Sequence, residues 1–290
     1  MKISKFYLGT FILFFVSALG WVLPEGTHSD NPTGRTRSWI TLEPGLEFGN
    51  FLSPRKSILG DSLIRVLRID PQHFHFKLLN ASAQRNSQRF SAKTWAEKNG
   101  LIATINASMY QADKITSVSL MKTKGHVNNI WFSKDRSVLA FDPKDSKLAP
   151  VQILDRDCQD VTKLREKYQT LIQSIRMIAC DGRNVWAPSK KMWSTSAIGM
   201  DQSGHILFIH VRSPYSTHAL IEILKVLPLE IKRAMYVEGG AEAQMYVHSG
   251  NRKLEFVGSF SSGSNENDAN SIGWPIPNVV GIARKSEPAH

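Results

Sequence analysis

The hydrophobic positions of the chain form one long apolar run followed by many short ones. Two lysines precede an uncharged apolar stretch from Phe6 to Leu23, which is the layout of a secretory signal. Small residues at Ala18 and Gly20 suit a signal peptidase, so residues 1–20 are predicted to be a signal peptide. A retained anchor is the alternative, because the stretch is just long enough to span ~30 Å of hydrocarbon. We therefore expect an exported protein, periplasmic or secreted, that meets a membrane only through this segment if it stays uncleaved.

Residues 21–38 show no apolar periodicity and contain several Pro and Gly residues, so they are predicted to be a linker. The folded part is expected over residues 39–290. That length is sufficient for one large hydrophobic core.

Within the folded part, short apolar runs separated by turn residues predict mainly strands. The predicted strands and hairpins are 63–69, 74–78, 101–105, 176–186 around Asp181-Gly182, 196–211, 233–237 and 244–257. Helical spacing of apolar residues predicts helices over 92–98, 159–172 and 218–227. Because strands outnumber helices, we expect a single α+β domain with a mixed or antiparallel sheet flanked by helices.

The chain has a formal net charge of +11, which raises the question of an anionic partner. Its Lys and Arg residues are scattered and form no dense basic run with interleaved aromatic residues, so we expect no nucleic-acid partner. Anionic envelope surfaces or acidic glycans fit an exported basic protein better.

Cys158 and Cys180 are the only cysteines. In an oxidising compartment they could form one disulfide, and two buried thiols are the alternative. The histidines do not suggest a metal site, since His205 and His210 fall on opposite faces of one predicted strand. We expect neither a metal nor a cofactor.

Carboxylates next to glycines are the candidate catalytic groups. Glu238 ends a predicted strand and precedes Gly239 and Gly240, a place where the backbone can approach a ligand closely and form an anion-binding nest. Cleaving a glycosidic bond generally requires two carboxyl groups. Glu238 is the first choice, followed by Glu242 and Asp201.

Each of these residues also has a structural interpretation. Asp201 could simply begin a turn, and the two glycines could serve close backbone packing. Asn106, which follows a buried strand, could bind a sugar hydroxyl or a phosphate oxygen, or could hold a turn. Glu238 could belong to a structural ion pair.

Several short segments also occur in the order and approximate spacing of the phosphodiester glycosidase family, which the chain resembles. They are Ile105–Tyr110, Ile172–Ser174, Asp181-Gly182, Ser196–Asp201, Met235–Ala243 and Pro275–Gly281. The resemblance implies hydrolysis of the bond between the anomeric carbon of a sugar and a phosphodiester oxygen. It also implies substrate contacts from Asn106, Ser196, Gly239 and Gly240.

The chain departs from the family pattern at several positions. Thr195 stands where many members have an arginine, so Lys190 and Lys191 are the nearest candidates for binding phosphate. Glu238 replaces the usual aspartate, and Glu242 replaces a serine. The leading hypothesis is thus an exported hydrolase of a glycosyl phosphodiester. The alternatives are a non-catalytic envelope module that binds anionic polysaccharide and a plain structural protein of the envelope.

Overall fold

The computed structural model describes residues 39–285, and the predicted signal peptide and linker lie outside this range. Within the range, no helix is both long and apolar enough to span a bilayer. The described residues form three sheets, and all of the strand pairs in them are antiparallel.

The first sheet contains both strands that carry the predicted carboxylates. Its order is β1 (Ile40–Glu43), β2 (Leu46–Leu52), β3 (Leu63–Ile69), β13 (Ile206–Tyr215), β12 (Trp193–Asp201), β14 (Ile231–Gly239) and β11 (Arg176–Ile178). The second sheet has the order β7 (His126–Asn129), β6 (Met121–Thr123), β10 (Tyr168–Ser174), β8 (Ser137–Pro143) and β9 (Val151–Asp155). The third has the order β16 (Arg252–Val257), β15 (Gln244–Ser249), β5 (Ala103–Asn106), β17 (Asn278–Arg284) and β4 (Phe74–Asn80).

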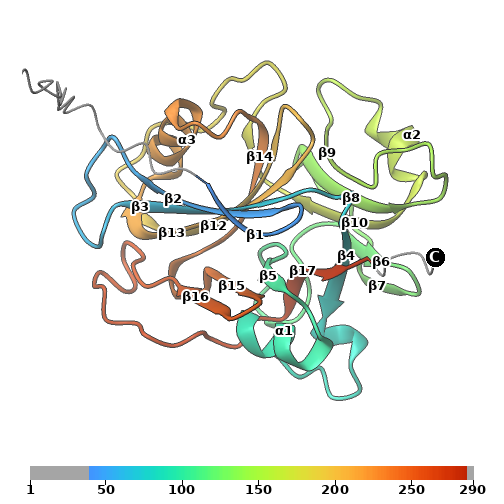
Figure 1. Ribbon diagram of the computed structural model, residues 1–290, viewed down its shortest axis with the longest axis horizontal. Helices are drawn as coiled ribbons and strands as arrows, with labels where there is room; N and C mark the ends of the chain where they lie inside the picture. The colour runs from blue at the N-terminus through green and yellow to red at the C-terminus, as the bar shows by residue number, and fades with distance from the viewer. Residues whose placement is uncertain (1–38, 286–290) are drawn as a thin grey trace, which may run out of the picture. The chain divides into compact units, whose positions relative to one another are not determined.

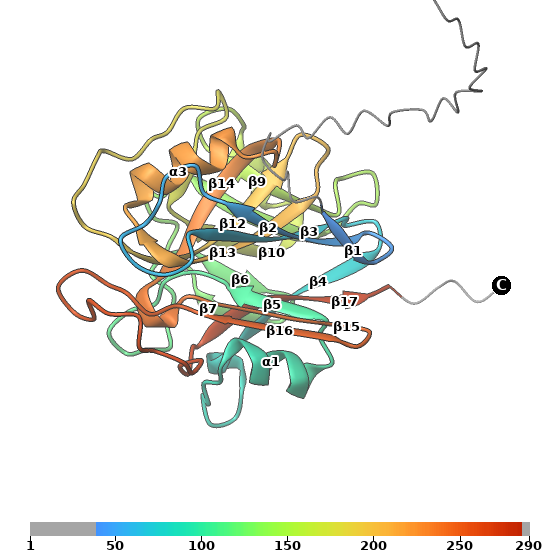
Figure 2. The ribbon, with the colours of Figure 1, turned by 60° about the vertical axis from the view of Figure 1, so that its left-hand side comes forward.

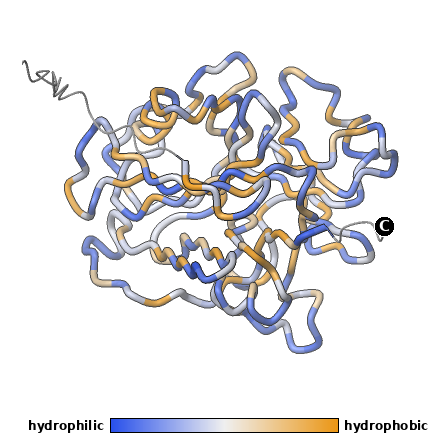
Figure 3. Tube along the Cα trace, viewed as in Figure 1, coloured by the Kyte–Doolittle hydropathy of each residue, from blue (hydrophilic) through white to orange (hydrophobic). Residues whose placement is uncertain are grey.

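The three sheets share one hydrophobic core. Ile198 and Met235 of the first sheet, Ile172 of the second, and Ile105 and Met245 of the third are all completely buried in it. The first and third sheets lie one above the other (Figures 1 and 2). The strands carry long hydrophobic stretches, whereas many outer loops are hydrophilic (Figure 3). Burial of both inner sheet faces explains why strands dominate the fold.

Two helices cover the outer faces of this arrangement (Figure 2). Helix α1 (Ala92–Asn99) starts at Ser91, whose hydroxyl accepts a hydrogen bond from the Thr94 amide, and ends at Gly100 in the left-handed conformation. Helix α3 (Thr217–Val226) starts at Ser216 in the same way and packs against the first sheet. Both agree with the predicted helices within a residue or two.

The predicted helix over 159–172 is wrong. Only Val161–Arg165 is helical (α2), and Tyr168 begins strand β10, which lies between β6 and β8. The aromatic and branched residues of this segment suit a strand with both faces covered, and a buried strand and a helix can share the same apolar spacing. The described residues therefore form a single domain built mostly of antiparallel sheet, richer in strand than the predicted α+β class.

Cys158 and Cys180 are joined by a disulfide with a Cα–Cα distance of 6.4 Å. The bond connects the loop before α2 to the turn after β11. Nearby, the buried Arg176 guanidinium contacts Asp155 at 2.9 Å and Asp157 at 2.7 Å. This end of the first sheet is thus fixed both covalently and by charge.

Candidate active site

Glu238 lies near the end of β14, where the pairing register between β12 and β14 shifts. Ser196 pairs with Glu238 but Ala197 pairs with Tyr236, so Val237 has no partner on β12. Such a bulge re-aims the side chains that follow it. The Glu238 carboxylate is only partly exposed and accepts a hydrogen bond of 3.0 Å from the Gly239 amide.

The electrostatic environment of Glu238 is unusual for a carboxylate. Burial raises its pKa from an ordinary 4.5 to about 8; the Gly239 hydrogen bond opposes this rise, and the neighbouring Glu242 carboxylate adds to it. Glu238 therefore holds its proton at neutral pH. A buried carboxyl with a perturbed pKa and a charged neighbour is typical of functional sites.

Gly239 and Gly240 are required by their surroundings. A Cβ atom on Gly239 would lie 2.1 Å from the Tyr236 hydroxyl oxygen and 3.0 Å from Cδ1 of Trp193. Gly240 has a φ of +66° and begins the short 3-10 turn η2 (Gly240–Glu242). The alternative of close backbone packing is thus present at these glycines, and the packing places Glu238 and Glu242 at the two ends of one tight turn; their contact with a substrate stays a prediction.

Asn106 holds this turn from the third sheet. Its side-chain amide donates to the Glu242 carbonyl at 2.9 Å, and its side-chain oxygen accepts from the Gln244 amide at 2.7 Å. The side chain is buried, and both of its polar ends are occupied. Asn106 therefore positions the carboxylates, which is the turn-holding interpretation of this residue.

Two tyrosines complete the surroundings of the acids. The Tyr110 hydroxyl donates to Oε1 of Glu242 at 3.3 Å, and burial together with both acids raises the Tyr110 pKa. Burial and the same two acids raise the pKa of Tyr236. Both tyrosines are therefore neutral hydrogen-bond donors beside the carboxyl pair.

Asp201 lies away from this group, which corrects its place among the catalytic candidates. It ends β12, whereas Ser196, the residue that pairs with Glu238, is ~17 Å distant along an extended strand. Its buried carboxylate accepts hydrogen bonds from the amide and the Nδ1 of His205, at 2.9 and 2.8 Å. Asp201 is a turn residue in this fold.

The remaining predicted contacts are distributed around the site. The Ser196 hydroxyl is buried and points to the Gln244 carbonyl at 3.5 Å. Thr195, where the sequence resemblance leads us to expect an arginine, is buried and pairs with Gly239, so it brings no charge to the site. Lys190 and Lys191 are exposed just before β12, and neither forms an ion pair with the two glutamates in the described part of the chain.

Two further residues, one near Tyr110 and one at the turn, were not expected from the sequence. The charge of Arg89 acts on the Tyr110 hydroxyl, and its guanidinium donates to the Pro275 carbonyl at 3.3 Å. His210 is fully buried with Nε2 3.2 Å from the Ala243 carbonyl, and burial lowers its pKa to about 3, so it is neutral and supports the turn. Neither residue belongs to a recognisable motif, and only the fold brings them close to the turn.

Comparisons with known proteins identify the family and the fold. A family model described as phosphodiester glycosidase matches residues 99–283, which include the strand end at Asn106 and the turn at Glu238–Glu242. No curated protein matches the sequence. Among solved structures, the zebrafish N-acetylglucosamine-1-phosphodiester alpha-N-acetylglucosaminidase catalytic domain, auto-inhibited by its pro-peptide, superposes with a TM-score of 0.61 at 13% identity, covering 84% of this chain and 85% of that one. A hypothetical protein from Synechocystis superposes with a TM-score of 0.54 at 12% identity, covering 87% of this chain and 64% of the other.

Proposed function

Because the chain belongs to the phosphodiester glycosidase family, we propose that it is an exported hydrolase that cleaves the bond between a sugar's anomeric carbon and a phosphodiester oxygen. The observation that carries the proposal is the pair Glu238 and Glu242, held at the two ends of one turn and close enough for one carboxyl to raise the pKa of the other. A glycoside hydrolase usually uses two carboxyl groups that lie in different environments.

The two acids take different roles in this proposal. Glu238, protonated at neutral pH, donates a hydrogen bond to the departing phosphodiester oxygen and so places no negative charge against the phosphate. Glu242, oriented by the Tyr110 hydroxyl, acts as the carboxylate that attacks the anomeric carbon or activates water. Because the departing phosphate monoester is a good leaving group, the proton on Glu238 serves charge neutralisation as much as acid catalysis.

Arg89 and Tyr110 would hold the phosphate on the side of the site formed by the third sheet and the segment before α1. Arg89 forms no ion pair with any acid in residues 39–285, so its charge is available to a ligand. It would replace the cation that the chain lacks at Thr195. An arginine fits this role because its planar group can bond two phosphate oxygens at once.

The test is release of reducing sugar by the mature domain from a panel of sugar-1-phosphodiesters that vary in sugar and aglycone. Glu238→Gln and Glu242→Gln should each abolish turnover, while Glu166→Gln, which changes an exposed glutamate after α2, should retain it. Absence of turnover across the whole panel with folded wild-type protein would refute the hydrolase.

A non-catalytic module that binds anionic polysaccharide is the second candidate. The net charge of +11 and the uncharged, buried Thr195 favour it. The affinity of such a module for polysaccharide would fall steeply as the salt concentration rises, because interactions between exposed charges are screened beyond ~10 Å at 0.1 M. Stereospecific turnover that depends on Glu238 would exclude it.

A further inference from the structure

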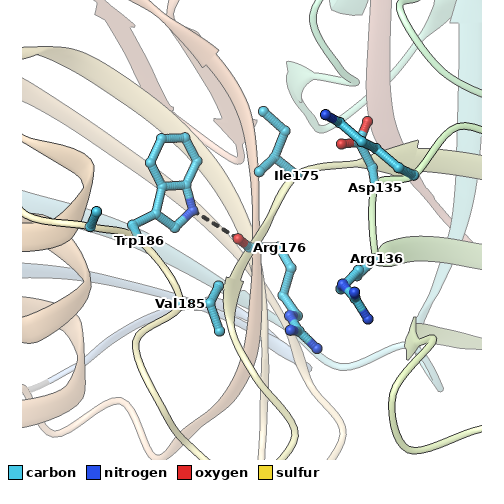
Figure 4. A pocket seen from close by; sticks show the side chains of 8 residues that line it. Asp135, Arg136, Ile175, Arg176, Val185 and Trp186 are labelled. Carbon is cyan, nitrogen blue, oxygen red and sulfur yellow. Dashed lines mark hydrogen bonds between the residues drawn. The ribbon is translucent and has the colours of Figure 1, made fainter.

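A pocket of about 410 Å³ opens beside β11 and lies outside the carboxyl pair described above (Figure 4). Ile175, Val185 and Trp186 supply its apolar wall. Asp135 and Arg136 lie on the opposite side (Figure 4), and Lys134 also lines the pocket. An apolar wall facing a few polar groups is the usual composition of a small-ligand site.

Two independent contacts join this pocket to the active site through Tyr236. The Trp186 ring packs against the Tyr236 ring at a centroid distance of 5.8 Å, and the Tyr236 hydroxyl lies against Gly239. The Ile175 carbonyl also accepts a hydrogen bond of 2.9 Å from the Tyr236 amide. One tyrosine side chain therefore separates the pocket wall from the glycine that follows Glu238.

The Trp186 indole is held in one orientation. Its Nε1 donates to the Arg176 carbonyl at 2.8 Å (Figure 4), and Tyr236 supports one side of the ring. Val185 beside it is 37% exposed. A fixed aromatic surface next to exposed apolar atoms can bind the C–H face of a ligand, and binding does not have to order the aromatic side chain first.

The charges around the pocket balance. Arg176 is paired with Asp155 and Asp157, and Arg136 also pairs with Asp157. Lys134 and Asp135 are adjacent in sequence and opposite in charge, and Asp135 accepts hydrogen bonds from two serine hydroxyls at 2.6 and 2.9 Å. The rim thus offers donors and acceptors without a net charge. This favours a neutral ligand rich in hydroxyl groups over a phosphate or a carboxylate.

We propose that this pocket binds an uncharged sugar unit of the substrate, at a subsite next to the carboxyl pair. The sugar's C–H face would lie on Trp186 and Ile175, and its hydroxyls would bond to Asp135, Arg136 and Lys134. This inference rests on the proposed function and extends it: the substrate carries a neutral saccharide and is larger than a single sugar-1-phosphodiester.

Binding is measured first, independently of turnover, by calorimetry on the full chain carrying Glu238→Gln. The probes are cellotetraose, maltotetraose and chitotetraose, with inorganic tripolyphosphate as the anionic comparison. At least one tetrasaccharide should bind, and Trp186→Ala should weaken it about tenfold, the equivalent of roughly 1.4 kcal/mol. Val185→Arg, which fills the pocket from an exposed position and so keeps the fold, should weaken it similarly.

Trp39→Ala is the matched control. Trp39 is also a half-buried tryptophan, but it lies beside β1, at the edge of the first sheet opposite to β11 and the pocket. Trp39→Ala should leave tetrasaccharide binding unchanged. The inference is overturned if no tetrasaccharide binds or if Val185→Arg leaves the affinity for the tetrasaccharide intact. It is also overturned if tripolyphosphate binds instead and Val185→Arg abolishes that binding.

Kinetics then separate this inference from the proposed function. Given an active enzyme, kcat/KM is measured for a saccharide-extended phosphodiester and for a minimal one. Val185→Arg should lower the ratio of the first value to the second about tenfold, and Trp39→Ala should not change this ratio. An unchanged ratio in Val185→Arg would overturn the subsite while the hydrolase stands. If wild-type protein shows no turnover but binds a tetrasaccharide, and Val185→Arg weakens this binding, the hydrolase is refuted and the sugar site stands.

Discussion

Replacing Glu238 by glutamine should stabilise the protein, and more so at high pH. The pKa of Glu238 is raised from 4.5 to about 8, so the folded state keeps a proton that the unfolded chain releases between these values. The contribution of the Glu238 proton to the free energy of unfolding is then present in full below pH ~4.5. It falls as the pH rises through this window and levels off above pH ~8. At about 1.36 kcal/mol per pH unit the full shift corresponds to roughly 5 kcal/mol.

The partial exposure of Glu238 reduces this figure, and we expect about 2 kcal/mol in practice, or ~4–8 °C in Tm for a domain of this size. Glutamine resembles the protonated acid in shape and carries no charge. The assay is thermal unfolding of wild type and Glu238→Gln between pH 5 and 9, with Glu166→Gln as the exposed control. Equal Tm differences at pH 5 and pH 9 would refute the reasoning, because the carboxyl would then titrate alike in both states.

Three further predictions concern the support of the site. Asn106→Ala removes both hydrogen bonds that hold the Glu242 turn; it should cost about 2 kcal/mol in urea unfolding and lower kcat more than it raises KM. Gly239→Ala places a methyl group 2.1 Å from the Tyr236 hydroxyl, and should lower stability by about 1–3 kcal/mol and reduce turnover, both of which a combined Tyr236→Phe change should partly restore. Cys158→Ser opens a disulfide with a sequence separation of 22 and should cost ~3 kcal/mol, measured by thermal unfolding; reductant should lower the Tm of wild type but not of the variant.

The sequence predicts the local elements of this fold well. Alternating runs joined by turn residues identify the β12–β13 and β15–β16 hairpins, and serine caps identify α1 and α3. In the segment 159–172, the spacing of apolar residues predicts the wrong element. Apolar residues there fit a helical period, but pairing with β6 and β8 makes most of it a strand. That pairing involves residues far apart in the chain, which a local pattern does not contain.

The same distinction applies to the candidate site. Glu238, Gly239 and Gly240 can be selected from one short segment, because a strand end before two glycines is a local pattern. The role of Asn106 depends on a contact across a separation of 136 residues, and Arg89 approaches Tyr110 only through folding. Asp201 resembles Glu238 in sequence context but occupies the other end of the sheet. Long-range pairing, which no local spacing encodes, decides which acids meet.

The departures from the family pattern form one consistent change in charge. Relative to the pattern that the sequence resemblance implies, the chain lacks a positive charge at Thr195, next to Gly239, and gains a negative one at Glu242 in the following turn. Together they would repel an anionic phosphodiester if both glutamates were ionised. The burial that raises the pKa of Glu238 cancels one of these charges, and in the proposed function Arg89 supplies a cation from another segment. We expect Thr195→Arg alone to weaken the hold of Glu238 on the proton that the proposed mechanism uses, because a positive charge next to Gly239 favours the ionised form of a nearby carboxyl. The substitutions at 195 and 242 and the pKa of Glu238 therefore depend on one another.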